Sequence, residues 1–154
     1  MDITNFFKLS EGNWLCQKTF YDLSERKYKS LKDELSIKKE NMNMHDLKLI
    51  SFDQQNHISY SCKWKQSQNK QSNIIINTKK NYIYTYNNKS ISSIKEYKIE
   101  NNKLTICSKR NNLFITETIL FLNPNLRLAT IIVKNKFESL FISFSSEIKL
   151  NNKN

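Results

Sequence analysis

The chain has 154 residues and carries 25 lysines and arginines against 14 aspartates and glutamates, a formal net charge of +11. This length fits one domain, and because no run of eighteen apolar residues occurs, a membrane-spanning helix is excluded. The lysines are spread evenly and form no basic block, so the charge indicates a solvated exterior and not a nucleic-acid-binding tail. The N-terminal sequence lacks the basic start and apolar stretch of a secretory signal, and we expect no targeting presequence.

The first expected element is a short helix within residues 1–12. Asp2 is placed to cap its N-terminus, and Gly12 is placed to end it. Its apolar residues recur at helical spacing: Ile3, Phe6, Phe7 and Leu9. A second stretch, residues 41–52, repeats this spacing with Met44, Leu47 and Ile50. Both apolar stripes are expected to pack against the core and not against a partner.

The remainder of the chain alternates apolar and polar residues with a period of two, which is typical of β-strands. Ten such runs follow one another, at residues 13–23, 28–38, 57–65, 72–77, 81–86, 91–100, 103–109, 113–121, 125–134 and 139–150. Asparagine-rich and serine-rich joints separate them, and asparagine supplies the turn conformations that glycine supplies elsewhere. Regular short spacing of this kind predicts an antiparallel meander.

A mainly β fold of ten strands would leave long unpaired edges if the sheet stayed open. Closure into a barrel removes those edges, so we predict a closed antiparallel β-barrel with one or two short helices. Barrels of this size enclose room for one small ligand. The sequence therefore predicts a barrel with an internal binding site.

The cysteines and histidines give no sign of a metal site or of a nucleophile. Cys16, Cys62 and Cys107 are odd in number and far apart, with no metal-ligand spacing, and we expect reduced, buried and inert thiols. His45 and His57 have no acid or cysteine nearby that would suggest a metal or a catalytic triad. No metal is predicted.

One carboxylate stands inside an otherwise apolar and hydroxylic run, residues 114–133. Period two places Glu117 on the same face as Ile119 and Phe121, and a buried carboxylate must be paired, hydrogen-bonded or protonated. After a turn that holds the only proline, Arg127 falls on the inward face of the next strand. Adjacent antiparallel strands are expected to bring Glu117 and Arg127 into the same layer, facing one cavity.

Two interpretations of these residues stay open at this point. They can form a buried ion pair that fixes strand register, although such pairs contribute little to stability. Alternatively, Arg127 binds a ligand carboxylate bidentately, worth about 1.5–3 kcal/mol per charged hydrogen bond, and Glu117 donates a proton or accepts N–H groups. The second interpretation fits an anionic, conjugated ligand with N–H groups of its own.

Three segments resemble a known family: DITNFFKLSEGNWLCQKT (2–19), ETILFLNPNLRL (117–128) and FISFSSEIKL (141–150). They are similar to the S-type phycobiliprotein (chromophore) lyases, the CpcS/CpeS-like proteins. The middle of the chain, residues 27–98, matches only in its strand pattern and in Trp64. The resemblance implies a lipocalin-like (calycin) barrel in a single domain, with the helix in residues 1–12, the barrel in 13–150 and a polar tail in 151–154.

The resemblance also implies an activity and partners. Lyases of this type bind a phycobilin such as phycoerythrobilin or phycocyanobilin and attach it by a thioether bond to a cysteine of an apo-phycobiliprotein subunit. The bilin is a substrate and not a prosthetic group, and neither nucleic acid nor a membrane is expected as a partner. An Asn- and Lys-rich composition together with this family suggests a plastid (chloroplast stroma) protein. The sequence leaves open whether the protein works as a homodimer or with a second lyase subunit.

Site residues follow from the matched positions. Glu117 is the implied catalytic residue, which contacts the pyrrole nitrogens or protonates the bilin as a thiolate adds to it. The implied ligand-binding residues are Arg127, Asn125, Lys18, Tyr21, Trp64 and Lys149. Lys18 and Tyr21 stand where the family has arginine and histidine. The attacking sulfur belongs to the client subunit, so the chain's own cysteines are not needed as nucleophiles.

Two other functions compete with a lyase. A non-catalytic carrier of lipocalin type would bind a bilin, haem or fatty acid and transfer nothing. A basic oligonucleotide-binding barrel would need exposed stacking aromatics along a basic stripe. The aromatic residues here alternate into the strands without such a stripe, which disfavours the second alternative.

Overall fold

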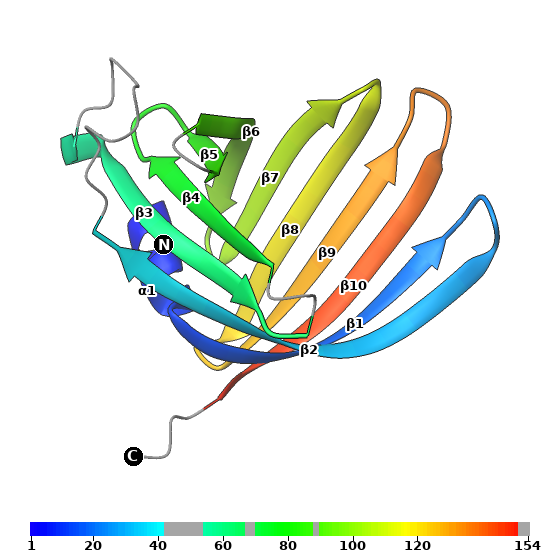
Figure 1. Cartoon of the computed structure of the whole chain (residues 1–154), viewed down its shortest axis with the longest axis horizontal. Coiled ribbons are helices and arrows are strands. Elements are labelled where there is room, and N and C mark those ends of the chain that lie inside the picture. The colour runs from blue at the N-terminus through cyan, green and yellow to red at the C-terminus, as the bar shows by residue number, and fades with distance from the viewer. Residues whose placement is uncertain (42–53, 67–69, 88–89, 151–154) are drawn as a thin grey trace.

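The computed structural model describes residues 1–41, 54–66, 70–87 and 90–150, and these form a closed antiparallel barrel (Figure 1). Its elements are the helix α1 (Ile3–Ser10), a single 3-10 turn η2 (Gln54–Asn56) and the strands β1 (Gly12–Asp22), β2 (Lys27–Glu40), β3 (His57–Trp64), β4 (Gln71–Asn77), β5 (Tyr82–Asn87), β6 (Ser90–Glu100), β7 (Lys103–Arg110), β8 (Leu113–Asn123), β9 (Leu126–Lys134) and β10 (Ser139–Leu150). Nearly all of the helical stretch expected at residues 41–52 lies outside the described residues.

Every strand pairs with the next one along the chain, and β1 pairs with β10 to close the barrel. The predicted meander, its closure and all ten strand runs are confirmed. Asparagine takes the left-handed backbone conformation at four turn positions, Asn81, Asn101, Asn111 and Asn112. Arg26 is a further such residue, with φ of 54° in the turn between β1 and β2. The turns of this chain thus form with a single glycine, because asparagine tolerates that conformation.

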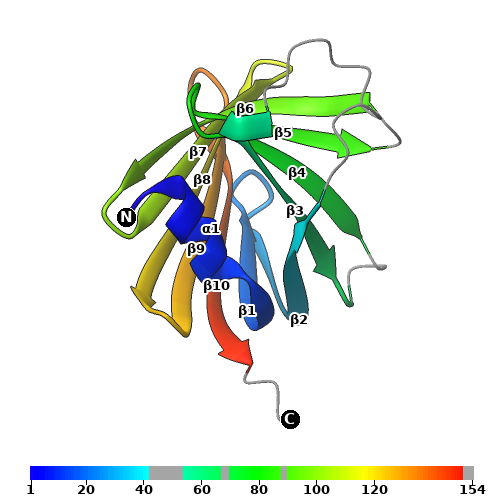
Figure 2. The same cartoon turned by 90° about the vertical axis from the view of Figure 1, so that its left-hand side faces the viewer.

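The helix α1 covers one end of the barrel (Figure 2). Its N-terminus is capped as predicted, since the Asn5 backbone N–H donates to the Asp2 carboxylate at 2.8 Å. The helix ends at Ser10, and Gly12 is the first residue of β1, with φ of +121°. Gly12 thus directly follows the C-cap residue Glu11 with a positive φ, as expected of a glycine that ends the helix, and a side chain at this position would also meet Lys149 Cε on β10 at 3.0 Å.

The apolar core gathers at the end that α1 covers. Phe6 and Trp14 are fully buried, and the Phe6 ring lies 5.0 Å from the ring of Phe121 in an edge-to-face contact. Tyr60 on β3 and Leu104 on β7 complete this core. In the part of the chain that the structure describes, apolar side chains therefore fill the α1 end of the barrel.

The three cysteines are free, but they are not all buried as expected. Burial raises the pKa of the Cys16 thiol to about 12 and that of Cys62 to about 11. Cys107 is exposed, because it has outward parity on β7, opposite to that of the inward Leu104 and Ile106. The expectation of buried thiols is thus wrong for Cys107. No helix in the described part of the chain is long and apolar enough to cross a membrane.

Candidate functional site: a barrel cavity above a sealed floor

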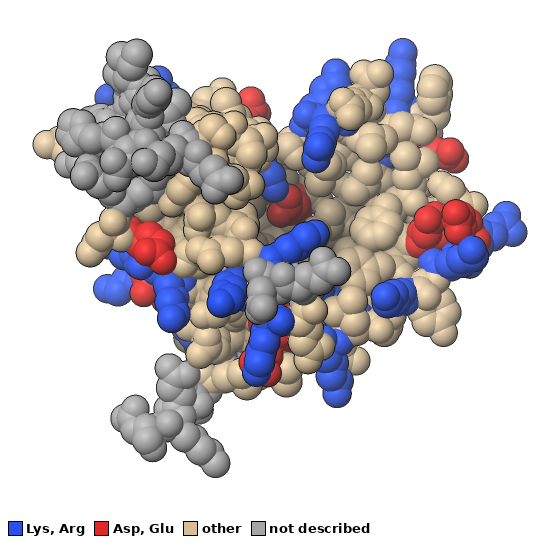
Figure 3. Space-filling view, viewed as in Figure 1, with Lys and Arg blue, Asp and Glu red and all other residues tan. Residues whose placement is uncertain are grey.

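A cavity of about 170 Å³ lies inside the barrel, lined by residues of β1, β2, β3, β8, β9 and β10. Its charged lining residues are Lys18, Glu117, Arg127 and Glu147. Aromatic and aliphatic side chains supply most of the remaining wall: Phe20, Leu35, Trp64, Ile119, Ala129 and Ile131. The space-filling view, which has the orientation of Figure 1, shows a hollow near the centre of the molecule with acidic and basic side chains next to each other (Figure 3).

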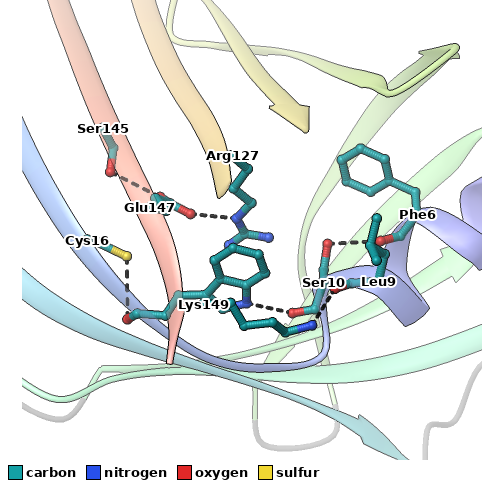
Figure 4. Close-up of polar contacts among 9 residues, drawn as sticks. Phe6, Leu9, Ser10, Cys16, Arg127, Ser145, Glu147 and Lys149 are labelled. Atoms are coloured by element: carbon teal, nitrogen blue, oxygen red, sulfur yellow. Dashed lines mark hydrogen bonds and ion pairs between the residues drawn. The ribbon is translucent and has the colours of Figure 1, made fainter. Parts of the chain in front are cut away.

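The floor of the cavity is a buried ion pair. The Arg127 Nε donates to the Glu147 Oε2 at 2.6 Å, and the two side chains are only 3% and 4% exposed. They meet because Arg127 and Glu147 lie directly opposite each other on β9 and β10. The Ser145 Oγ donates to the other carboxylate oxygen at 3.1 Å (Figure 4). The guanidinium also lies 4.3 Å from the ring centroid of Trp14, so its charge is compensated on two sides.

Hydrogen bonds tie this floor to α1. The indole N–H of Trp14 donates to the Ser10 carbonyl at 2.8 Å, and the Lys149 ammonium donates to the Leu9 carbonyl at 2.8 Å (Figure 4). These carbonyls belong to the last turn of the helix, where no intrahelical donor is available. Burial, followed by the nearby Arg127, lowers the pKa of Lys149. The floor, the first strand and the helix therefore form one hydrogen-bonded unit.

A second ion pair borders the cavity itself. The Lys95 Nζ donates to Glu117 Oε1 at 2.6 Å, and these side chains are 26% and 27% exposed. Lys95 comes from β6 and Glu117 from β8, so the bond spans the intervening strand β7. The carboxylate is thus oriented into a partly solvated space and keeps a cation beside it.

The register of β8 and β9 corrects the expected relation between Glu117 and Arg127. Arg127 lies opposite Phe121, whereas Glu117 lies opposite Ile131, two inward positions further from the turn. The prediction that they share a layer is wrong, because the tight turn at residues 124–125 pairs residues about equally far from it, and Arg127 is closer to the turn than Glu117 is. Both side chains still line the same cavity, and each has its own ion partner.

Lys18 is the cation that the cavity leaves unpaired. Its Nζ lies 3.0 Å from the ring centroid of Trp64, and within the described residues no carboxylate lies within ion-pairing distance of it. Burial lowers the pKa of Lys18, while Cys16 and Glu147 offset part of that shift. An anionic group that entered the cavity would find this ammonium available.

The chain matches the family model of CpeS-like proteins over residues 2–150. It belongs to the CpeS-like family. Over 150 residues it is 28% identical to a chromophore lyase CpcS/CpeS homolog of Porphyra purpurea, covering 96% of this chain and 98% of that protein. A homolog with the same name from Pyropia yezoensis is 26% identical, with 97% and 99% covered.

A solved structure shares the architecture of this CpeS-like protein. The S-type phycobiliprotein lyase CPES from Guillardia theta superposes with a TM-score of 0.77, covering 99% of this chain and 95% of that one. The identity between the two is 16%, so the likeness shows the fold. The lipocalin-like barrel expected from the sequence is therefore confirmed by both the strand order and a related structure.

The residues expected at the site of this CpeS-like protein fall into two groups. Lys18, Trp64, Glu117 and Arg127 line the cavity together. The other three, Asn125, Tyr21 and Lys149, do not line it. They stay untested as functional residues, but their positions separate them from the cavity.

Each of these three positions has a structural explanation. Tyr21 is 44% exposed on the outer face, which the alternation of β1 already indicates, since it has the parity opposite to Lys18. Asn125 is exposed in the turn between β8 and β9, where its carbonyl accepts the backbone N–H of Lys149. The Lys149 side chain points inward but below the floor, against α1.

The sequence analysis did not select Lys95 or Glu147 as site residues of this CpeS-like protein. The alternation of each strand could have identified them, because each is a charged residue at an inward-facing position. Lys95 alternates with Tyr97, which is buried, and Glu147 alternates with the buried Ser143 and Ser145. A charge at an inward position of a barrel strand is the pattern that marks a polar interior.

A larger hollow of about 580 Å³ lies beside the hairpin between β9 and β10. It is lined by Phe114 and by the hairpin residues 134–139. Lys136, Phe137 and Glu138 are all exposed, and this hollow contains no buried polar side chain. The internal cavity, with its four charged groups, is the better candidate for a binding site in the described part of the chain.

Proposed function

We propose that this CpeS-like protein is a phycobiliprotein lyase, which binds a linear tetrapyrrole in the barrel and attaches it by a thioether bond to a cysteine of a phycobiliprotein subunit. Family membership and two relatives named chromophore lyases, both matched over nearly their whole length, support a lyase role. The observation that carries the proposal is the cavity, where an unpaired ammonium and a paired carboxylate face apolar and aromatic walls.

The cavity matches the chemistry of an open-chain tetrapyrrole group by group. Such a molecule has flat conjugated rings, a row of pyrrole N–H groups and two propionates. The walls formed by Phe20 and Trp64 suit the rings. The Glu117 carboxylate suits the N–H groups, and the Lys18 ammonium suits a propionate. The pyrrole N–H groups and one propionate thus each have a partner of opposite charge or hydrogen-bonding character.

Size then determines how much of the ligand enters. Pockets for drug-sized molecules measure about 300–1,000 Å³, and this cavity measures about 170 Å³. The protein would therefore hold one part of the tetrapyrrole between Lys18 and Glu117 and leave the rest extending from the barrel. An extended chromophore of this kind is accessible to a cysteine of another protein.

The structure favours Lys18 over Arg127 as the anchor for a propionate. The Arg127 Nε already donates to Glu147, and that carboxylate compensates its charge in a nearly water-free setting. Lys18 has no such partner among the described residues. In our proposal Arg127 shapes the floor beneath the ligand, and Lys18 supplies the free positive charge.

Glu117 is the proposed catalytic residue. In the reaction, a C–S bond forms as the client thiolate adds to an exocyclic double bond of the terminal ring, and a proton is added to the adjacent carbon. The proton released by the client thiol balances this step. Glu117 lies in the cavity and is held by Lys95 at 2.6 Å, so it is placed to relay that proton or to fix the pyrrole N–H groups.

The proposed partners are a phycobilin and an apo-phycobiliprotein subunit, and the proposed location is the plastid stroma. The two lyase relatives come from the red algae Porphyra purpurea and Pyropia yezoensis, which supports a plastid-related protein. The Asn- and Lys-rich composition is typical of a compact, AT-biased genome such as that of a plastid.

A transfer assay tests the proposal. The purified protein is mixed with phycoerythrobilin or phycocyanobilin and an apo-subunit, and the subunit is examined for covalent colour after denaturing electrophoresis. We expect a coloured subunit with the wild type and a loss of colour with Glu117→Gln. Glu34→Gln is the matched control, because Glu34 also pairs with a lysine, at 3.1 Å, but on the outer surface.

A carrier would give a different result in the same assay. It would change the absorbance of the bilin and leave the subunit uncoloured after denaturation. Wild-type transfer by Glu117→Gln would instead reject the assignment of Glu117 while leaving the lyase activity in place.

A further inference from the structure

Three hairpins at the end of the barrel away from α1 carry features that the proposed bilin site does not use. In a closed antiparallel meander, the turns after odd-numbered strands lie at one end and those after even-numbered strands at the other. Because α1 leads into the start of β1, the β1–β2, β7–β8 and β9–β10 hairpins lie at the opposite end. We call residues 22–29, 109–114 and 134–139 of these hairpins the hairpin rim, which follows one edge of the molecule in Figure 1.

The rim holds the two most exposed large apolar side chains of the described residues. Phe137 is 88% exposed in the β9–β10 hairpin, and Tyr28 is 75% exposed near the start of β2. Phe137 and the exposed Phe114 both line the hollow of about 580 Å³ beside this hairpin. Aromatic side chains are enriched at protein–protein interfaces, where a few of them supply most of the binding energy. The rim therefore has the anchors of a protein-binding surface.

Hydrogen bonds hold Phe137 in its exposed position. The backbone N–H groups of Phe137 and Glu138 both donate to the Asn135 Oδ1 at 2.8 Å. The Asn135 N–H donates in turn to the Glu138 carbonyl at 3.0 Å. Asp22 stabilises the β1–β2 turn in the same way, by accepting two backbone N–H groups at 3.0 Å. Since these turns are already formed, little conformational entropy is lost when a partner binds them.

The charge of the rim is basic. Its residues include seven lysines and arginines against three aspartates and glutamates. Two of the acids are already engaged, because Asp22 caps its own turn and Glu25 pairs with Lys27 at 2.9 Å. Figure 3 shows basic side chains projecting along this edge, with acidic ones among them. A partner that complements this surface is acidic.

Both exposed arginines of the chain belong to the rim. The chain has three arginines: Arg127 is buried in the floor, whereas Arg26 and Arg110 are exposed. Arg26 has a φ of 54°, and the other four non-glycine residues with positive φ in the described chain are all asparagines. Turn formation therefore does not explain an arginine at this position. A guanidinium binds carboxylates in a bidentate manner that a lysine cannot match.

The rim is also close to the cavity along the strands. Phe114 precedes Glu117 by three residues on β8, which corresponds to about 10 Å. Apolar side chains fill the α1 end of the described barrel, so the part of a bilin that leaves the space between Lys18 and Glu117 would extend toward the rim. A thiol that attacks this part approaches past the rim hairpins.

We propose that the hairpin rim is the docking surface for the client protein, an inference that rests on the lyase function proposed above. The occupant is an acidic surface of the apo-phycobiliprotein subunit beside its acceptor cysteine. Phe137 packs into an apolar recess of that surface, and Arg26 and Arg110 bind carboxylates around it. The lysines of the rim steer the acidic client toward the cavity.

Biolayer interferometry tests this docking without any transfer. The full chain is titrated, up to about 100 µM, against apo-phycobiliprotein subunits whose acceptor cysteine is replaced by alanine. We expect micromolar binding that weakens between about 0.05 and 0.5 M NaCl, because salt screens the opposite charges. Phe137→Ser should raise the dissociation constant at least about tenfold. Arg26→Asn combined with Arg110→Gln should raise it about tenfold and flatten its salt dependence.

Matched controls come from the α1 end of the barrel. Leu122→Ser removes an apolar side chain that is 53% exposed on β8, and Lys79→Gln with Lys80→Gln removes two exposed charges from the turn between β4 and β5. These controls should bind the client like the wild type. Arg26→Asn preserves its turn, because asparagine holds a positive φ elsewhere in the chain. Far-UV circular dichroism and bilin affinity should be unchanged in all variants.

Several outcomes would overturn the docking surface. One is a wild type that binds none of the apo-subunits at about 100 µM. Another is equal weakening by the rim variants and their controls. A third is a pair of rim variants that bind the client normally but no longer bind phosphatidylserine vesicles, which would assign the rim to a membrane.

Covalent colouring of an unmodified subunit separates this proposal from the lyase function. If the wild type colours the subunit and the rim variants bind and transfer normally, the lyase stands and the docking surface is rejected. If client binding depends on the rim but the wild type leaves the subunit uncoloured, the docking surface stands and the lyase is rejected.

Discussion

The two ion pairs inside the barrel have the same length and opposite surroundings. Arg127–Glu147 and Lys95–Glu117 are both 2.6 Å long, but the first is 3–4% exposed and the second 26–27%. The first joins adjacent strands and is held by Trp14 and Ser145, whereas the second spans a strand and faces the cavity. A pair that is almost fully buried and held by neighbouring side chains acts as a fixed part of the fold, although it forms the floor of the cavity. A pair beside a cavity can exchange contacts with a ligand.

The largest expected effect comes from breaking the floor pair. Glu147→Ala leaves the Arg127 guanidinium buried without its carboxylate, which should lower the free energy of unfolding by about 3–5 kcal/mol. Urea unfolding monitored by tryptophan fluorescence measures this. Arg127→Met combined with Glu147→Leu should recover most of the loss, because apolar side chains need no compensation.

Two results would contradict this view of the floor. One is a Glu147→Ala variant as stable as the wild type. The other is a double variant less stable than either single one. Glu34→Ala provides the control, because the outer Glu34–Lys65 pair is exposed and should be worth less than about 1 kcal/mol.

The next effect concerns the unpaired cation between the two pairs. Lys18→Met removes the only ammonium that the described lining of the cavity leaves without a carboxylate, so bilin affinity should fall about 10- to 100-fold, the equivalent of one charged hydrogen bond. Absorbance titration with the bilin measures this. Lys18→Arg should retain most of the affinity. Unchanged binding by Lys18→Met would move the propionate anchor to another group.

Lys95 tests whether the pair beside the cavity acts as a unit. Lys95→Met should lower the transfer rate about tenfold, because Glu117 loses the partner that orients it, and should cost about 1–2 kcal/mol of stability, between exposed and buried pairs. In a Glu117→Gln background the same substitution should have no further effect on transfer. Additive effects of the two substitutions would show that Lys95 acts independently of Glu117.

The smallest effect is a dependence on pH. Since burial lowers the pKa of Lys18, its ammonium is present below that lowered pKa and is lost as the pH rises through it. Bilin affinity should therefore decline as the pH rises through this lowered pKa, at a lower pH than for an ordinary lysine. Lys18→Arg keeps its charge and should not show this decline. Parallel pH profiles for both proteins would contradict the role of Lys18.

Several features of the site could be predicted from the alternation of inward and outward residues along each strand. Alternation placed Glu117 and Arg127 on inward faces, and both line the cavity. The same alternation contained evidence against Tyr21 as a cavity residue, since its parity is opposite to that of Lys18. Lys95 and Glu147 carried the same parity signal, but period two says nothing about which inward charges meet across a barrel.

The sequence by itself determined the ten strands, their order, the capped N-terminal helix and the asparagine turns, because period two, helical spacing and turn preference are local properties of neighbouring residues. Only the tertiary structure decided which charges pair. The register of β9 with its two neighbours places Arg127 beside Phe121 on β8 and opposite Glu147 on β10, whereas Glu117 pairs with Lys95 across β7. Pairing depends on register and closure, which bring together residues that are distant along the chain.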